Sequence, residues 1–135
     1  MTLTDTGPLV ALTNKLDRNH QRCVAVLPSL RPPLVTTWVC FGEAMHLLKR
    51  EGGHAAQAAL WRYVTRGALA FHLNTGAEIQ RMCELMEKYR DTPMDLADAS
   101  LVVAAESLQQ SLIFTLDCDF HVYRLPNGVA FEIVP

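Results

Sequence analysis

Charged residues are scarce in this chain, and it has neither long apolar runs nor paired cysteines. Only 19% of the 135 residues are Asp, Glu, Lys or Arg and 50% are apolar, which excludes a disordered chain and is enough for a core. No apolar run reaches the roughly 18 residues that a membrane-spanning helix needs. The first residues show no basic leader or cleavage site. We therefore expect a cytoplasmic protein that does not enter a membrane.

Cysteine spacing and net charge exclude further classes. The four cysteines form no Cys-x-x-Cys pair and no cluster with histidine at zinc spacing, so we expect them to be reduced and mostly buried. The net charge of −2 at pH 7 differs from the strongly basic balance of proteins that hold nucleic acid by phosphate neutralisation alone. A local contact with nucleic acid stays open, because bound metal ions can supply positive charge.

Short strand-like segments alternate with helical ones along the whole chain. Strands are expected at 1–4, 34–37, 68–73, 112–117 and 129–135, and helices at 7–16, 17–30, 38–53, 54–67, 75–91 and 95–109. This alternation predicts an α/β fold with a mainly parallel sheet, in a single domain over residues 1–135. In such sheets, ligands bind beyond the carboxyl ends of the strands.

Four acidic residues stand where such a sheet would bring them together. Asp5 follows the first strand and Asp117 ends the fourth, so we expect both on one rim of the sheet. Asp98 heads the apolar face of its helix, and Glu43 shares a helix face with apolar neighbours. We therefore expect Glu43 and Asp98 to point inward, where a carboxylate needs a partner or a metal ion.

Three of these acids also have an ordinary explanation, whereas capping explains Asp98 less well because it points toward the core. Asp5 could cap the following helix, Asp117 could be a turn residue, and Glu43 could pair with a basic residue such as Lys49. For Asp95, which begins the helix of Asp98, an N-cap is the favoured interpretation.

Taken together, the acids favour a metal site. Carboxylates about 4 to 6 Å apart repel by roughly 3 to 4 kcal/mol per close pair at an effective dielectric of about 20, so such a cluster needs protons or a cation. Oxygen ligands without sulfur or nitrogen suit Mg²⁺ or Mn²⁺ rather than zinc.

Four segments, in this order and spacing, carry a family resemblance. They are TDTGPLVAL (4–12), TTWVCFGEAMHLL (36–48), MDLADASLVVAAE (94–106) and TLDCDFHVYR (115–124). In these segments, and over essentially the whole chain, the sequence resembles the PIN-domain ribonucleases, and among them the VapC-like toxins of type II toxin–antitoxin systems. The resemblance implies a PIN-like three-layer α/β/α fold with a mainly parallel five-stranded sheet in the order 3-2-1-4-5.

The resemblance also implies a function. It indicates an Mg²⁺-dependent endoribonuclease, with Mn²⁺ as a second usable ion, that hydrolyses RNA phosphodiesters with metal-activated water. A small antitoxin protein and a homodimer are the implied partners. The catalytic and metal-binding residues would be Asp5, Glu43, Asp98 and Asp117. The alternative is a PIN-like RNA-binding or protein-interaction module without cleavage activity, against which the retention of all four acids argues.

Further residues have weaker assignments. Asp95 and Asp119 are expected as accessory acids. Thr6 and Thr115 could hold carboxylates or water, although ordinary turn and strand roles explain them equally well. The residues after the acid loop that could contact RNA are His121, Tyr123 and Arg124, and a partly exposed loop is the simpler interpretation for them.

The two tryptophans complete the expectations. Trp38 and Trp61 are expected as anchors in the core or at a dimer interface rather than as platforms for RNA bases.

Overall fold

The computed structural model describes residues 1–135 and contains a five-stranded sheet in which every pairing is parallel. The strands are β1 (Thr2–Thr4), β2 (Leu34–Thr37), β3 (Leu69–His72), β4 (Leu112–Phe114) and β5 (Glu132–Val134). Their order across the sheet is β3-β2-β1-β4-β5. The predicted fold class and strand order are therefore confirmed.

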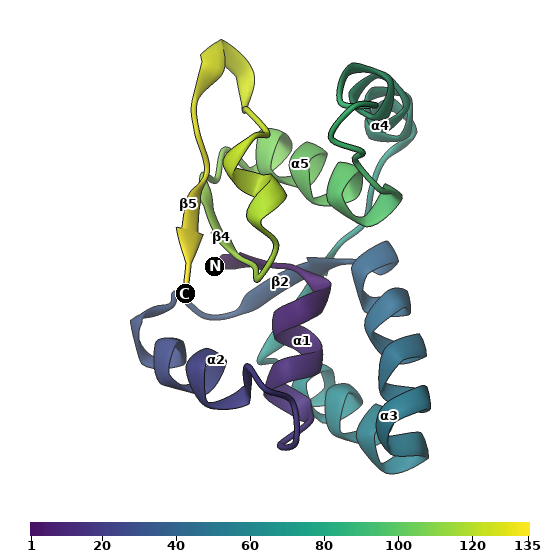
Figure 1. Cartoon of the computed structure of the whole chain (residues 1–135), viewed down its shortest axis with the longest axis vertical. Helices are drawn as coiled ribbons and strands as arrows, with labels where there is room; N and C mark the ends of the chain where they lie inside the picture. Colours follow the sequence, from purple (N-terminus) through teal and green to yellow (C-terminus); the bar gives the residue numbers. More distant parts are fainter.

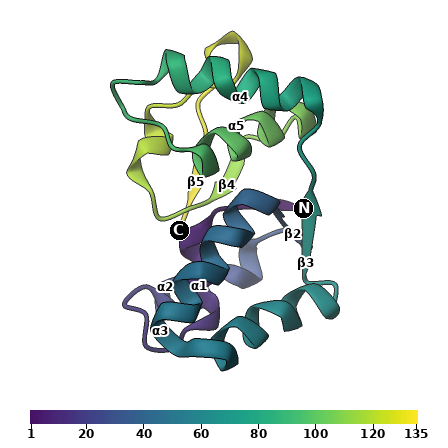
Figure 2. The ribbon, with the colours of Figure 1, turned by 90° about the vertical axis from the view of Figure 1, so that its right-hand side faces the viewer.

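Helices cover both faces of the sheet and make three layers (Figures 1 and 2). One face carries α1 (Thr6–Thr13), α2 (His20–Val26) and α3 (Trp38–Thr65), and the other carries α4 (Gly76–Lys88) and α5 (Leu96–Leu108). Because strand side chains alternate between faces, Ile113 packs with the α4 and α5 layer while Phe114 packs with the α1, α2 and α3 layer. Two apolar cores thus hold the sheet between them.

The long helix α3 is broken at Gly53. Its backbone there has φ 62° and ψ −154°, a conformation that favours glycine because a Cβ atom would be strained. The two helices expected at 38–53 and 54–67 are therefore found in sequence order, and the break between them lies at the expected boundary.

Several expected elements are longer than the observed ones. The helix expected at 7–16 ends at Thr13, and the strand expected at 112–117 ends at Phe114. Asp117 is therefore three residues beyond its strand and begins the short 3₁₀ turn η2 (Cys118–His121). Two further 3₁₀ turns are η1 (Leu27–Ser29) and η3 (Pro126–Gly128).

Cysteine and tryptophan burial differs from the expectation. All four cysteines are free, but only Cys23 and Cys40 are buried, while Cys83 and Cys118 are exposed. Trp38 and Trp61 are 57% and 45% exposed, so the core position expected for them is wrong. Both rings pack against Phe41, and a position at an interface stays a prediction. None of the helices combines the length and apolar character required to cross a membrane.

Candidate active site

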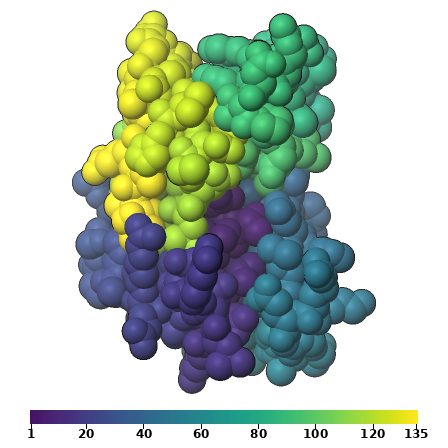
Figure 3. Space-filling model, viewed as in Figure 1, coloured from purple at the N-terminus to yellow at the C-terminus, as the bar shows by residue number.

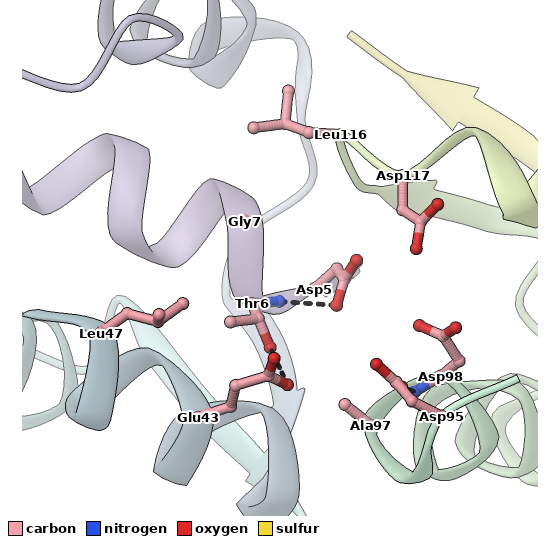
Figure 4. Close-up of a pocket in the computed structure, with 10 residues that line it drawn as sticks. All are labelled: Asp5, Thr6, Gly7, Glu43, Leu47, Asp95, Ala97, Asp98, Leu116 and Asp117. Atoms are coloured by element: carbon pink, nitrogen blue, oxygen red, sulfur yellow. Dashed lines mark hydrogen bonds between the residues drawn. The ribbon is translucent and has the colours of Figure 1, made fainter.

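Five carboxylates from four parts of the chain line one pocket at the carboxyl end of β1 (Figure 4). They belong to Asp5, Glu43, Asp95, Asp98 and Asp117, and their side chains point toward a common space. The pocket has a volume of about 420 Å³, and its other lining residues are Thr6, Gly7, Leu47, Ala97 and Leu116. No lysine, arginine or histidine lines it. The space-filling view shows this region as a hollow between the purple start of the chain and the yellow-green segment after β4 (Figure 3).

Both carboxylate oxygens of Asp5 accept short hydrogen bonds, and the thiol of Cys40 adds a longer contact of 3.9 Å to Oδ1. It is the N-cap of α1, and its Oδ1 accepts a hydrogen bond from the backbone N–H of Thr6 at 2.7 Å. Its Oδ2 accepts one from the hydroxyl of Thr115, also at 2.7 Å. The residue is only 7% exposed. Burial raises the pKa of Asp5 from 3.8 to about 6, although both hydrogen bonds act to lower it. Asp5 thus serves as a helix cap and a pocket carboxylate at once.

Asp98 is buried in the first turn of α5. The hydroxyl of Tyr123 donates a hydrogen bond of 2.8 Å to its Oδ2, and the residue is 4% exposed. Burial is the largest cause that raises the pKa of Asp98, the bond from Tyr123 lowers this pKa, and the charges of Asp95, Asp5 and Asp117 add to the rise. Together these effects bring the pKa from 3.8 to about 7. The inward orientation expected for Asp98 is therefore found.

Asp95 caps α5 and also faces the pocket. Its Oδ1 accepts a hydrogen bond of 2.8 Å from the backbone N–H of Asp98, as the favoured N-cap interpretation required. The side chain is exposed and lines the pocket beside Asp98. Its charge contributes to the raised pKa values of Asp98 and Glu43.

Glu43 lies at the rim of the pocket rather than inside the protein. The residue is exposed, so the inward orientation expected from helix periodicity is wrong. It forms no ion pair with Lys49 or any arginine. Its Oε2 lies 3.4 Å from the hydroxyl of Thr6, which also lies 3.3 Å from the carbonyl of Cys40. Partial burial and the charge of Asp95 raise the pKa of Glu43.

Thr115 joins the two sides of the pocket. Its hydroxyl donates to Asp5 and accepts a hydrogen bond of 3.0 Å from the backbone N–H of Asp117. Asp117 in turn caps η2, because its Oδ1 accepts from the N–H of Asp119 at 2.9 Å. Asp119 lies outside the pocket, although its carboxylate, that of Asp117 and the thiol of Cys118 lie within 4.8 Å of one another.

The three residues proposed to contact RNA are placed differently from one another. His121 is exposed and lines a hollow beside the acidic pocket. Arg124 is also exposed, but its guanidinium donates to the carbonyls of His121 and Tyr123 at 2.6 and 2.8 Å. Tyr123 is fully buried, so the prediction that its side chain contacts RNA is wrong.

The bond from Tyr123 to Asp98 was missed by the sequence reasoning. Tyr123 packs edge-to-face against Tyr89 and Phe120 in the core on the α5 side of the sheet. Nothing in the spacing of 25 residues between Tyr123 and Asp98 marks them as partners. Only the folded path of the chain after η2 brings the hydroxyl to the carboxylate.

The donor set of the pocket suits a hard divalent cation. All five ionisable groups are carboxylates, and no basic side chain of the pocket neutralises them. The raised pKa values of Asp5 and Asp98 reflect burial without a neighbouring positive charge. Oxygen-only sites of this kind match Mg²⁺ or Mn²⁺ and differ from the nitrogen and sulfur sites of zinc.

Comparison with known proteins places this geometry in context. No family model matches the chain. In sequence it is 28% identical over 134 residues to Ribonuclease VapC26 of Mycobacterium tuberculosis, a match that covers 98% of this chain and 99% of the relative.

Solved structures share the fold. VapC20 of Mycobacterium tuberculosis, described as a sarcin-ricin loop cleaving toxin, aligns with TM-score 0.83 and 20% identity over 90% of this chain and 94% of its own. A toxin–antitoxin complex from Klebsiella pneumoniae aligns at 0.68, with 18% identity over 96% of each chain. VapBC2 from Rickettsia felis, bound to a promoter DNA fragment, aligns at 0.69, with 13% identity over 99% of this chain and 98% of the other. The fold is PIN-like, and the resemblance to VapC-like proteins indicated by the sequence motifs is confirmed.

Proposed function

We propose that this protein is a metal-dependent endoribonuclease and the toxin of a toxin–antitoxin pair. The observation that carries the proposal is the pocket of five carboxylates without a facing cation. The relative named as a ribonuclease supports RNA as the substrate, and the structural neighbour described as a sarcin-ricin loop cleaving toxin supports a cleaving toxin. A PIN-like module that only binds RNA or protein is the competing proposal, and it offers no reason to keep this clustered charge.

Mg²⁺, with Mn²⁺ as a substitute, is the proposed cofactor. Asp5 and Asp98 would hold the ion, because both are buried in the pocket and fixed by hydrogen bonds. Glu43 and Asp117 would complete the site directly or through water. When bound, the ion supplies positive charge that offsets the carboxylates and the substrate phosphate and makes nearby water more acidic.

The protein's own groups then have distinct tasks in the hydrolysis. Water attacks the phosphorus atom, the bond from phosphorus to the 3′-oxygen breaks, and the 3′-oxygen takes a proton from solvent. We assign the proton released by the attacking water to Glu43, which is at the solvent-facing rim and has a raised pKa. Thr115 and Tyr123 keep the carboxylates of Asp5 and Asp98 in place during the reaction.

The proposed partners follow from the same comparisons. Two structural neighbours are described as a toxin–antitoxin complex and as VapBC2, which supports a small antitoxin protein as the inhibitor. We also propose a homodimer, for which the exposed rings of Trp38 and Trp61 provide apolar surface. Because cellular RNA is the proposed substrate, we place the activity in the cytoplasm.

Cleavage of structured RNA tests the proposal. The purified protein should cleave RNA slowly with Mg²⁺ and not with EDTA. Asp5→Asn and Asp98→Asn should each lower the rate at least about a hundredfold, since each removes a charged group of the site. Asp91→Asn is the matched control, because Asp91 is exposed and outside the pocket. Wild-type activity in Asp5→Asn would show that a contaminant cleaves the RNA and would refute the proposal.

A further inference from the structure

A second hollow adjoins the acidic pocket and has a different chemistry. The two hollows share Leu116 and Asp117 as a common wall. The second one, of about 250 Å³, is also lined by Arg22, Cys118 and His121. It therefore offers a guanidinium and an imidazole next to a pocket whose ionisable groups are all carboxylates.

Arg22 reaches this hollow from the α2 side of the molecule. One guanidinium nitrogen, Nη2, donates to the carbonyl of Pro135 at 3.2 Å, which links the α2 side chain to the residue after β5. No aspartate or glutamate side chain pairs with Arg22, and the bond to Pro135 uses only one of its two terminal nitrogens, so most of its five N–H donors stay available. In the space-filling view, the dark blue part of the chain near the start of α2 lies against the yellow-green segment after β4 and the yellow end of the chain (Figure 3).

Arg124, the arginine expected from the sequence to contact RNA, is less free. Its guanidinium donates to two backbone carbonyls of its own loop, and it lines neither hollow. The imidazole of His121 has no hydrogen-bond partner within the protein and lines the second hollow. The pair that can meet a ligand here is therefore Arg22 and His121.

We propose that Arg22 and His121 bind the RNA phosphate next to the scissile one. This inference rests on the proposed function, because it assumes that the scissile phosphate enters the acidic pocket. Neighbouring phosphates of one strand are a few ångströms apart, and the two hollows share a wall. A guanidinium matches the geometry and charge of a phosphate, and the imidazole adds a donor or a stacking surface for the adjoining base.

The distribution of charge along the chain agrees with this placement. Residues 1–67 contain eight lysines and arginines against four aspartates and glutamates, whereas residues 68–135 contain four against ten. Arg22 belongs to the basic half and Asp117 to the acidic half. The second hollow thus lies where the basic part of the molecule meets the carboxylate pocket, and an RNA strand would be attracted from that side.

Steady-state cleavage of a fluorescent RNA hairpin by the full chain with Mg²⁺ tests the proposal. Arg22→Gln should raise KM about tenfold with kcat nearly unchanged, because it removes a charge-assisted contact made in both the ground state and the transition state. The slope of log(kcat/KM) against log[KCl] should become shallower by about 0.7, the value for one phosphate contact on a single strand. Arg22→Lys should recover part of the affinity, and His121→Ala should also raise KM.

A matched variant separates this site from a general charge effect. Arg18→Gln removes the same charge from an exposed neighbour that lines neither hollow. It should leave KM within about twofold of wild type. Equal effects of Arg22→Gln and Arg18→Gln, or an unchanged KM in Arg22→Gln, would overturn the proposal.

Binding of the same hairpin, followed by fluorescence anisotropy, distinguishes the two proposals. Binding that depends on Arg22 without any cleavage would retain the phosphate site and overturn the hydrolysis. Cleavage that is independent of Arg22 would retain the proposed hydrolysis and overturn the phosphate site. If the wild-type chain neither binds nor cleaves the hairpin, both proposals are refuted. An unchanged melting temperature of Arg22→Gln would show that its altered kinetics do not come from unfolding.

Discussion

Replacement of Asp98 by asparagine should stabilise the metal-free protein. Burial is the main cause that raises the pKa of Asp98 from 3.8 to about 7. Above pH 7 the side chain is ionised in the folded protein, and this ionised form is less favourable there than in the unfolded chain. Each pKa unit corresponds to about 1.4 kcal/mol, which sets a ceiling of roughly 4 kcal/mol on this cost. The amide oxygen of asparagine can still accept the hydrogen bond from Tyr123. We expect a gain in the free energy of unfolding of about 1 to 3 kcal/mol at pH 8.

The sign of the pH dependence follows from the raised pKa. The cost of ionising Asp98 is absent below its unfolded-state pKa of about 4, grows between pH 4 and 7, and is complete above pH 7. Urea unfolding in EDTA should therefore show Asp98→Asn as more stable at pH 8 and nearly equal to wild type at pH 4. A variant that is less stable at pH 8, or a difference that does not change with pH, would refute this reasoning.

Three further predictions concern the groups around the two buried carboxylates. Tyr123→Phe should lower Mg²⁺ affinity about tenfold in a thermal-shift titration, because it removes the bond to Asp98. Tyr89→Phe removes another hydroxyl from the same aromatic cluster and should leave the affinity unchanged. Equal Mg²⁺ affinity in the two variants would contradict a positioning role of Tyr123. Thr115→Val should lower the free energy of unfolding in urea by about 1 to 2 kcal/mol and lower the cleavage rate, because it removes the hydrogen bond to Asp5. Thr115→Ser keeps the hydroxyl and should restore both quantities. Full activity in the valine variant would count against a role for this hydrogen bond. Calorimetry should show Mg²⁺ affinity increasing from pH 6 to pH 8, because protons compete with the ion for Asp5 and Asp98, and a constant affinity would exclude these groups as ligands.

The sequence was most informative where a residue's position in its own element decides its environment. Asp5 caps a helix directly after a buried strand, Asp98 lies in the first turn of a helix with an apolar face, and both are buried in the pocket. The alternation of strands and helices predicted the parallel sheet, while the order of its strands came from the family resemblance. The break at Gly53 followed from the conformational freedom of glycine.

Local periodicity was less informative where tertiary packing determines the environment of a side chain or the end of an element. Glu43 shares a helix face with apolar residues, but that face ends at the open pocket, so the side chain is exposed. The strand before Asp117 is three residues shorter than its apolar pattern suggested, because the chain turns into η2. Arg22 and Tyr123 reach the site from distant segments, and their roles depend on the fold as a whole.

Anomalous diffraction from crystals soaked in Mn²⁺ tests the central claim most directly. We predict one or two Mn²⁺ peaks within the pocket, with oxygens of Asp5 and Asp98 as direct ligands at about 2.0 to 2.3 Å. A protein that shows no peak among these carboxylates at saturating Mn²⁺, or that binds the ion only elsewhere on its surface, would contradict the account.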